Sequence, residues 1–367
     1  MKTLKYTFLV WLFLVGGLLV SCSDNDEANY APLHVTKVST VLDREQGIEK
    51  ADLAQYIIVH GTGLNAVNSI FVNDVPVDLK KVYFTADELT FSIPRVIPGK
   101  VNNLITLSSD ATTLEIPMSV FVPDLRVDGM GNEFTPAGDM MAVVGDFFDL
   151  YEITTESGQL FFGDKEMKIE KAVQDTLYFK LPEDAAVGSK IKLVSPIAGE
   201  VIVPGKYKER GHMLCDFDPL VGWGGAQYVS GGPTPAPFSG QYCHFTIKKG
   251  ELGENEWGGA IIQIGTSYTD DMKANPDNYM VKFEVNTIIP LAKRWILFCF
   301  SQIQYQWKPF NSGLAFNTDK KWSTVSFNLG ELWKGEIPAD GIIQIMGNGT
   351  PEDTDICFDN FRIVPND

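Results

Sequence analysis

The sequence predicts an all-β protein. Short runs of Val, Ile, Phe, Thr and Tyr alternate along the chain with clusters of turn-forming residues. No long stretch places apolar residues at helical spacing. Aromatic residues make up 11% and charged residues 21% of the 367 residues, a composition typical of folded domains. A chain of this length has room for two or three such domains.

The charge balance limits the kinds of partner. The formal net charge is −17. Nucleic acids and anionic membrane surfaces are bound by clustered Lys and Arg, so neither is expected as a partner. Neutral polysaccharides are compatible with this charge.

The first residues resemble an export signal. Lys2 and Lys5 precede the short apolar run 6–20, and Ser21 and Cys22 follow. The apolar run is short for a membrane-spanning helix. The cysteine at the cleavage point resembles the bacterial lipobox, which implies a signal peptide over 1–21 and a lipid (palmitate) on Cys22 as the membrane anchor. An ordinary signal peptide with an incidental cysteine is the alternative.

Residues 22–33 are expected to form an acidic tether. The acidic run Ser23-Asp24-Asn25-Asp26-Glu27 resembles the surface-export signal of Bacteroidetes lipoproteins. This resemblance implies a lipid-anchored location on the outer membrane, facing the cell exterior. A solvated linker would have the same composition.

Residues 34–122 are expected to form one small sandwich. The expected strands end at characteristic residues, Gly61 after the first and Pro94 after the third. The strands are Tyr56–His60, Ser69–Val72, Leu89–Ile93 and Asn103–Leu107.

Residues 123–205 repeat this order. Gly145 and Pro182 follow Gly61 and Pro94 at nearly the same interval, so we infer an internal repeat of immunoglobulin-like size. The strand, glycine, hairpin and strand-proline order resembles TIG (IPT) domains. Neither repeat shows a loop cluster of aromatic residues, so we assign both a spacer role. Prolines at the seams, Pro123 and Pro204, favour a semi-rigid stalk.

Residues 206–367 are expected to form a jelly-roll-like β-sandwich. Six of the seven tryptophans fall here. Many short strands are typical of a two-sheet sandwich. The last strand shifts its apolar phase at Asp359-Asn360, which indicates a β-bulge. The expected strands are His244–Ile247, Ala260–Ile264, Tyr279–Val285, Trp295–Phe300, Thr324–Phe327, Gly341–Met346 and Ile356–Val364.

This last segment resembles the C-terminal module of bacterial surface glycan-binding lipoproteins. It also resembles carbohydrate-binding jelly rolls, on the residues Cys215–Asp218 and Phe358–Ile363. The order of lipobox, acidic run, two TIG repeats and aromatic β domain carries the resemblance along nearly the whole chain. It implies capture of a polysaccharide without cleavage. It also implies partnership with a TonB-dependent transporter and a glycan-binding partner lipoprotein.

The glycan contacts are expected to be aromatic. Trp223 and Trp257 are flanked by glycines, which leaves their faces uncovered, and an exposed ring suits the C–H face of a sugar. Tyr228 lies between them. Tyr305 and Trp307 share one strand face and have polar neighbours, so they are further candidates. The alternative is that this face belongs to the core.

Three other tryptophans are expected to be structural. Trp295 and Trp322 lie in or beside apolar strands and are expected in the core, and Trp333 is expected on a short helical turn.

A structural calcium ion is possible where the first and last strands of this domain meet. Asp218, or Asp216 in its place, would supply hard oxygen ligands together with Asp359, although ordinary strand-end carboxylates would occupy the same positions. No cofactor is otherwise required. The remaining cysteines follow no metal pattern. Cys299 and Cys357 lie in strand-like apolar runs, so buried free thiols are expected, with a Cys215–Cys357 bridge as the alternative. They are Cys215, Cys243, Cys299 and Cys357.

No catalytic motif is present, so we expect a binding protein and not an enzyme. The sequence has no nucleophile elbow, zinc-protease helix motif or phosphate loop. Glu254 and Glu256 beside Trp257 are the acidic cluster that a surface glycoside hydrolase would use, which is the second hypothesis. A protein-binding adhesin is the third.

Overall fold

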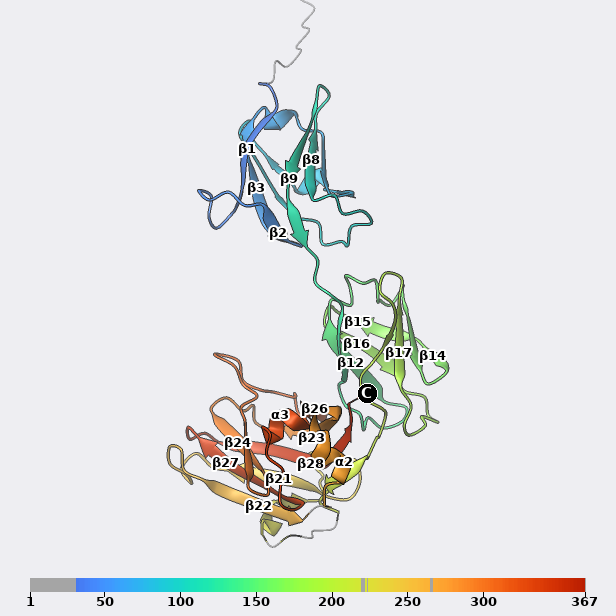
Figure 1. The fold of residues 1–367 in the computed structure, drawn as a ribbon, viewed down its shortest axis with the longest axis vertical. Coiled ribbons are helices and arrows are strands. Elements are labelled where there is room, and N and C mark those ends of the chain that lie inside the picture. The colour runs from blue at the N-terminus through green and yellow to red at the C-terminus, as the bar shows by residue number, and fades with distance from the viewer. Residues whose placement is uncertain (1–30, 219–221, 223, 265–266, 367) are drawn as a thin grey trace, which may run out of the picture. The chain divides into compact units, whose positions relative to one another are not determined.

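The computed structural model describes residues 31–218, 222, 224–264 and 267–366. For residues 259–264 it describes the backbone only. The chain divides into two compact units that end at Val122 and begin at Pro123. Nearly all of the regular structure is strand, so the all-β prediction is confirmed (Figure 1). None of the short helices in the described ranges has the length or apolar content needed to cross a membrane.

The first unit is a sandwich of two four-stranded sheets. The sheet orders are β1-β3-β7-β6 and β5-β4-β8-β9, with a parallel β10-β2 pair beside them. Alternate residues of the central strands point inward and form one apolar core. The strands are β1 (His34–Thr40), β2 (Lys50–Asp52), β3 (Tyr56–Thr62), β4 (Ser69–Val72), β5 (Val75–Pro76), β6 (Tyr83–Phe84), β7 (Glu88–Ser92), β8 (Leu104–Ser108), β9 (Thr113–Pro117) and β10 (Ser119–Phe121).

The second unit begins with a sandwich of the same topology. Its sheet orders are β11-β12-β16-β15 and β14-β13-β17-β18, which match the two sheets of the first unit strand for strand. A separate apolar core fills it. The strands are β11 (Arg126–Met130), β12 (Met140–Asp146), β13 (Gln159–Phe162), β14 (Lys165–Met167), β15 (Ile169–Ala172), β16 (Thr176–Lys180), β17 (Ile191–Ser195) and β18 (Gly199–Ile202).

The repeated glycines have one physical cause. Gly61 in β3 and Gly145 in β12 each face a register shift in the neighbouring strand, β1 or β11. A Cβ at Gly61 would lie 1.9 Å from the carbonyl oxygen of His34, and one at Gly145 would lie 2.1 Å from that of Arg126. Only glycine therefore allows the two backbones to approach at this bulge.

The remainder of the second unit is a larger two-sheet sandwich. Its six-stranded sheet has the order β20-β21-β28-β23-β26 with β19 also paired to β28, and its four-stranded sheet has the order β22-β27-β24-β25. Every strand expected here from the sequence is present. The elements are β19 (His212–Cys215), β20 (Val229–Ser230), β21 (Tyr242–Ile247), β22 (Gly258–Ile264), α2 (Asp270–Ala274), β23 (Tyr279–Thr287), β24 (Arg294–Phe300), β25 (Ile303–Trp307), β26 (Ser323–Asn328), α3 (Leu329–Trp333), β27 (Ile342–Gly349) and β28 (Thr354–Pro365).

The central strand β28 contains the expected bulge. Lys282 pairs with Arg362 and Glu284 with Asp359, so two residues of β28 face one residue of β23. Asn360, inside the bulge, has a φ of 50°. The core beside it is aromatic, and the rings of Phe283 and Phe361 stack with centroids 4.7 Å apart. The four described cysteines are free and buried, as expected, and no Cys215–Cys357 bridge forms.

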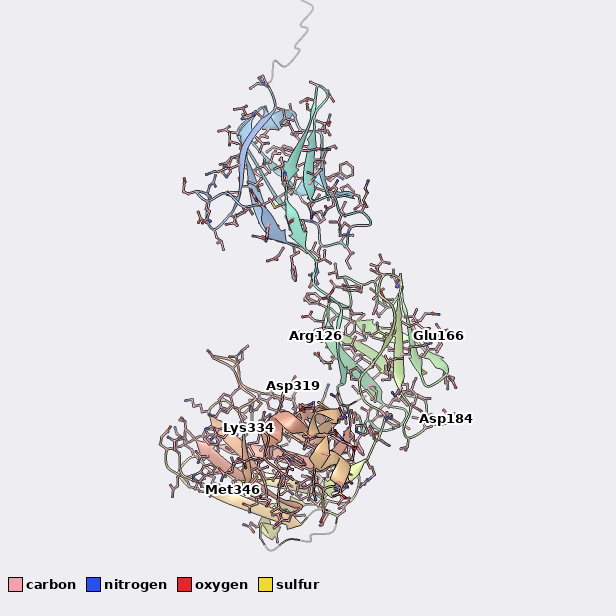
Figure 2. The ribbon with its side chains drawn as sticks, in the orientation of Figure 1. Arg126, Glu166, Asp184, Asp319, Lys334 and Met346 are labelled. Carbon is pink, nitrogen blue, oxygen red and sulfur yellow. The ribbon has the colours of Figure 1, made fainter. Side chains whose placement is uncertain are left out.

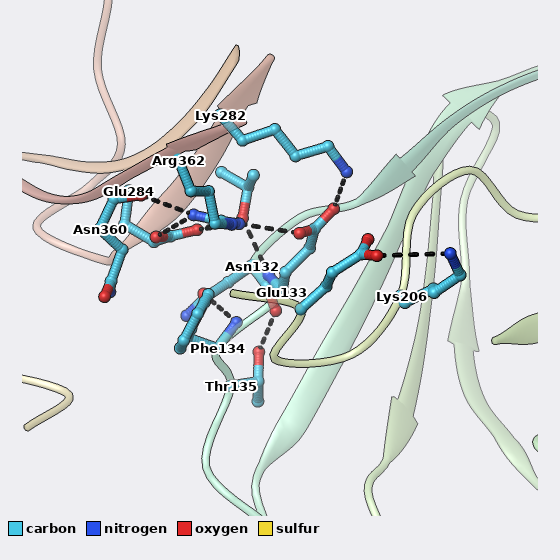
Figure 3. Close-up of polar contacts among 11 residues, drawn as sticks. Asn132, Glu133, Phe134, Thr135, Lys206, Lys282, Glu284, Asn360 and Arg362 are labelled. Carbon is cyan, nitrogen blue, oxygen red and sulfur yellow. Dashed lines mark hydrogen bonds and ion pairs between the residues drawn. The ribbon is translucent and has the colours of Figure 1, made fainter. Parts of the chain in front are cut away.

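Within the second unit, a buried ionic network joins the immunoglobulin-like domain to the C-terminal sandwich (Figure 3). Arg362, fully buried, donates to Glu284 in β23 at 2.8 Å and to Glu133, in the loop after β11, at 2.8 Å. Lys282 pairs with the other oxygen of Glu133. The guanidinium also lies 4.8 Å from the ring centroid of Phe134. Two cations and two carboxylates are thus enclosed between the domains.

Backbone contacts fix the same junction. Thr324 in β26 donates its N–H to the carbonyl of Gly131 at 2.9 Å, and its hydroxyl accepts from the N–H of Glu133 at 2.9 Å. Gly205 borders the network with a φ of +88°, and a Cβ there would lie 2.4 Å from a Glu133 oxygen. The junction therefore has a defined geometry.

Glu133→Gln is expected to destabilise the second unit. Removing one carboxylate leaves Arg362 and Lys282 buried with a single negative partner, at a cost of about 3–5 kcal/mol. The matched control is Glu200→Gln, which breaks the 3.1 Å pair with Lys192 on the exposed sheet surface and should cost less than about 1 kcal/mol. Equilibrium denaturation of the mature chain measures both. Equal effects for the two variants would contradict the structural role of the network.

Candidate functional site

Trp257 lies on the surface of the C-terminal sandwich, just before β22. Its side chain is 44% exposed. It contacts Trp295, at the start of β24, edge to face with ring centroids 5.6 Å apart. The ammonium of Lys308 lies 4.7 Å from the Trp295 ring. We call these three residues the Trp257 surface. It combines apolar ring faces with a cationic donor, which suits a hydroxylated and partly apolar ligand.

The loop that carries Trp257 is held against β27. Asn255 donates its N–H to the carbonyl of Gly349 at 3.0 Å, and the hydroxyl of Thr350 donates to Glu254 at 3.0 Å. Glu256 accepts from the N–H of Gly253 at 2.7 Å. The loop therefore presents Trp257 in one position, which lowers the entropy lost on binding.

Two glycines shape this surface. A Cβ at Gly349 would lie 2.6 Å from the Trp295 ring, and one at Gly258 would lie 2.5 Å from Leu252. Leu252 packs against the glycine after Trp257, and a larger residue there would have to displace the end of its side chain. The exposure of Trp257 agrees with the prediction, although packing explains the glycine better than ring accessibility does.

Trp307 is not on a binding surface. It is 4% exposed and lies in the core, with ring centroids 5.2 Å from Phe316 and 5.6 Å from Phe283. The hypothesis that Trp307 contacts glycan is therefore wrong, because both faces of its indole are covered. The face of β25 that carries it is the core face, which is the alternative allowed by the sequence.

The two candidate tyrosines are half-buried beside this core. Tyr305 packs 5.0 Å from Phe327, and Tyr228 packs 5.2 Å from Phe245. Burial raises the pKa of both phenols. Among the described residues, the ring contacts of both tyrosines are with the core and not with Trp257 or Trp295. Trp223 lies outside the residues that the structure describes.

The other tryptophans differ partly from expectation. Trp333 is buried in the short helix α3, in agreement with the helical turn expected there from the sequence. Trp295 and Trp322 were expected in the core, but both are half-buried. Trp295 belongs to the Trp257 surface instead. Its place as the first apolar residue of β24, next to Arg294, was the available signal that it lies at the end of a strand.

Asp218 and Asp359 do not form a calcium site among the described residues. No group of three or more His, Cys, Asp or Glu side chains there could hold a metal ion. Asp218 instead accepts from the N–H of Gln241. Asp359 is 2% exposed and accepts from the N–H of Asn360 at 2.8 Å. The calcium hypothesis is therefore not supported, because each carboxylate already serves the local backbone.

Glu254 and Glu256 are both exposed, in the loop before β22. Glu256 accepts a hydrogen bond from within that loop, and Glu254 accepts one from Thr350, just after β27. A glycosidase needs two carboxyls aimed at opposite sides of one glycosidic bond. These two instead stabilise the conformation of the loop.

The C-terminal sandwich is similar to a known family of binding modules. Residues 207–365 match the family model described as the surface glycan-binding protein B xyloglucan binding domain. The resemblance to Bacteroidetes surface glycan-binding proteins drawn from the sequence is thereby confirmed. The match covers less than half of the chain, and the family is described as a binding domain.

Solved structures resemble the chain over most of its length. The surface glycan-binding protein PbSGBP-B from Prevotella bryantii has a TM-score of 0.55 and 18% identity, covering 92% of this chain and 100% of that one. At this identity the likeness shows a shared fold. SGBP-B from a complex xyloglucan utilization locus in Bacteroides uniformis has a TM-score of 0.47 and 16% identity, with 90% and 99% covered. No curated protein matches the chain.

Asp359→Asn is expected to stabilise the protein at pH 8. Burial raises the pKa of the Asp359 carboxyl well above its ordinary value, and Glu284 and Asp218 nearby raise it further. The folded chain therefore holds this proton more tightly than the unfolded chain. The resulting stability is fully present below about pH 4 and is lost as pH rises through the folded pKa.

Asparagine at position 359 has no proton to lose, so the variant avoids the loss of stability at high pH. It keeps the side-chain oxygen that accepts the hydrogen bond from the N–H of Asn360. The midpoint of thermal unfolding should rise at pH 8 and match wild type near pH 4. A lower midpoint at pH 8, together with a calcium-dependent increase for wild type, would instead restore the calcium hypothesis.

Proposed function

We propose that the protein is a non-catalytic cell-surface glycan-binding protein, whose C-terminal sandwich captures a polysaccharide for uptake and degradation by partner proteins. The observation that carries this proposal is the match of residues 207–365 to a xyloglucan-binding domain family. Xyloglucan, a neutral polysaccharide, is accordingly the first candidate ligand. The net charge of −17 is compatible with a neutral chain.

The Trp257 surface is the proposed contact. An exposed indole stacks on the C–H face of a sugar ring, and the half-buried Trp295 fixes the orientation of Trp257. Lys308 supplies a donor for hydroxyl oxygens. Each sugar gains little from such a shallow surface, so affinity should increase with glycan length.

The domain plan supports a display role. We assign 1–21 to a signal peptide, 22–33 to a tether, 34–122 and 123–205 to spacer domains, and 206–367 to glycan binding. Cys22 carries the lipid anchor in this proposal and is the only contact with the membrane. A TonB-dependent transporter and a partner lipoprotein of the same system would receive the captured glycan.

Trp257→Ala should weaken binding of xyloglucan by about tenfold or more, equal to about 1.4 kcal/mol, because the stacking face is lost. Affinity gel electrophoresis over xyloglucan and other plant, host and fungal polysaccharides measures the effect. The control is Tyr83→Ala, which removes a 67% exposed aromatic from the first spacer domain. Unchanged retardation of the Trp257 variant would remove this surface from the proposal.

Cys22→Ala should release the protein from the membrane fraction, because a signal peptide without the lipidated cysteine leaves no anchor. Fractionation of cells, with metabolic labelling by a palmitate analogue, measures the change. Ser21→Ala keeps a small residue before the cysteine and serves as the control. Membrane association of the Cys22 variant equal to wild type would refute lipid anchoring.

A further inference from the structure

A groove lies between the immunoglobulin-like domain of the second unit and the C-terminal sandwich, apart from the Trp257 surface. Its volume is about 880 Å³, inside the roughly 300–1,000 Å³ range of small-ligand sites. Figure 2 shows Asp319, one of its lining residues, on the side of the C-terminal sandwich next to that domain. We call this the interdomain groove. The lining residues that matter here are Met140, Ala142, Tyr178, Phe238, Asn286 and Trp322.

One wall is the outer face of a sheet that would ordinarily be polar. In β12 the inward residues Met141 and Val143 are buried, but the outward residues Met140 and Ala142 are also apolar. Met140 remains 50% exposed. Half-buried strands usually alternate apolar and polar residues, so this strand has a second face suited to apolar contact.

Tyr178 of β16 extends this wall. It pairs with Ala142 across the sheet and is half-buried. The ammonium of Lys171 lies 5.3 Å from its ring centroid. The wall therefore offers an aromatic ring together with hydrogen-bond donors, which is the combination that sugars use.

The opposite wall is a fixed aromatic loop. The indole N–H of Trp322 donates to the carbonyl of Ala236 at 2.8 Å, and its ring lies 4.9 Å from that of Phe238. Tyr242 donates its hydroxyl to the carbonyl of Pro235 at 2.9 Å. The loop is thus held in place in the absence of ligand, which favours binding.

A buried amide without a partner lies at this groove. Asn286 in β23 lines it and is 1% exposed, and neither its amide nitrogen nor its amide oxygen has a hydrogen-bond partner among the described residues. A buried unpaired amide is costly, so its presence needs an explanation. A sugar hydroxyl both donates and accepts, so it would satisfy this amide once the side chains that shield it from solvent move aside.

We propose that the interdomain groove is a second carbohydrate-binding site, which takes a short neutral segment of a polysaccharide between Tyr178 and Trp322. The site takes the same ligand class as the Trp257 surface and so rests on the proposed function. The charged lining residues are of both signs: Lys171, Lys320 and Lys321 against Asp139 and Asp319. The two signs nearly cancel, so the lining carries no strong charge and is compatible with a neutral ligand.

The first test blocks the groove. Met140→Arg places a long cation on an exposed position of the wall without entering the core, and Val187→Arg makes the same charge change at a 71% exposed position of the same domain outside the groove. Isothermal titration of the mature chain with xyloglucan oligosaccharides should give two bound oligosaccharides per protein chain for wild type and for Val187→Arg. Met140→Arg and Tyr178→Ala should each lose one equivalent, and Trp257→Ala should lose the other.

The second test separates ligand binding from folding. Asn286→Leu keeps the side-chain size and removes an amide that has no partner, so the midpoint of thermal unfolding should not fall. Binding at the groove should weaken. A lowered midpoint with unchanged binding would show that the amide serves the fold, and would overturn its assigned role.

The outcomes distinguish the two proposals. If wild type binds none of the polysaccharides, the proposed function fails and this inference fails with it. If wild type binds one equivalent, Trp257→Ala abolishes it and Met140→Arg has no effect, only the second site is refuted.

Discussion

The second unit depends on a buried ionic network between two domains, with Arg362 at its centre. Arg362 is fully enclosed and satisfied by Glu284 of its own sandwich and Glu133 of the neighbouring domain. Removing these charges from water is expensive, and burial raises the pKa of Glu284 even beside the guanidinium. Such a network adds little net stability compared with an apolar contact, but it tolerates only one arrangement of its members. Its main effect is to fix how the two domains dock.

Docking explains a difference between the two immunoglobulin-like repeats. In the first repeat, His60 precedes the bulge glycine Gly61, and its imidazole lies 2.8 Å from the hydroxyl of Ser39 and 3.2 Å from Glu88. In the second repeat, Val144 precedes Gly145, and the outer face of β12 is apolar. The repeats share a topology because the inward residues and the glycines are equivalent. Their outer faces diverge because that of the second repeat borders another domain.

The sequence predicted the parts of the fold that depend on local pattern. Strands follow from alternation of apolar residues, the repeat follows from Gly61 and Gly145, and the bulge follows from the phase shift at Asp359-Asn360. Trp307 shows the limit of this reasoning. Tyr305 and Trp307 are two residues apart in a strand, so they lie on one face, but the spacing does not tell whether that face is the core. The interdomain groove was not predicted, because Met140, Asn286 and Trp322 are far apart in sequence and meet only through docking. The available signal was β12, which is apolar on both faces.

Two proposed sites on one compact unit would have a consequence that neither has alone. A long glycan held at the proposed Trp257 surface would have its next segment confined near the groove at a high effective concentration, provided that the chain can span both sites. Loose docking would spread the distance between the sites and reduce this advantage. In this proposal the network around Arg362 would contribute to recognition without contacting the ligand, by holding the second wall of the groove in place. A short oligosaccharide cannot reach both sites and would gain no affinity from this arrangement. The protein should therefore bind polymers more tightly than their short degradation products.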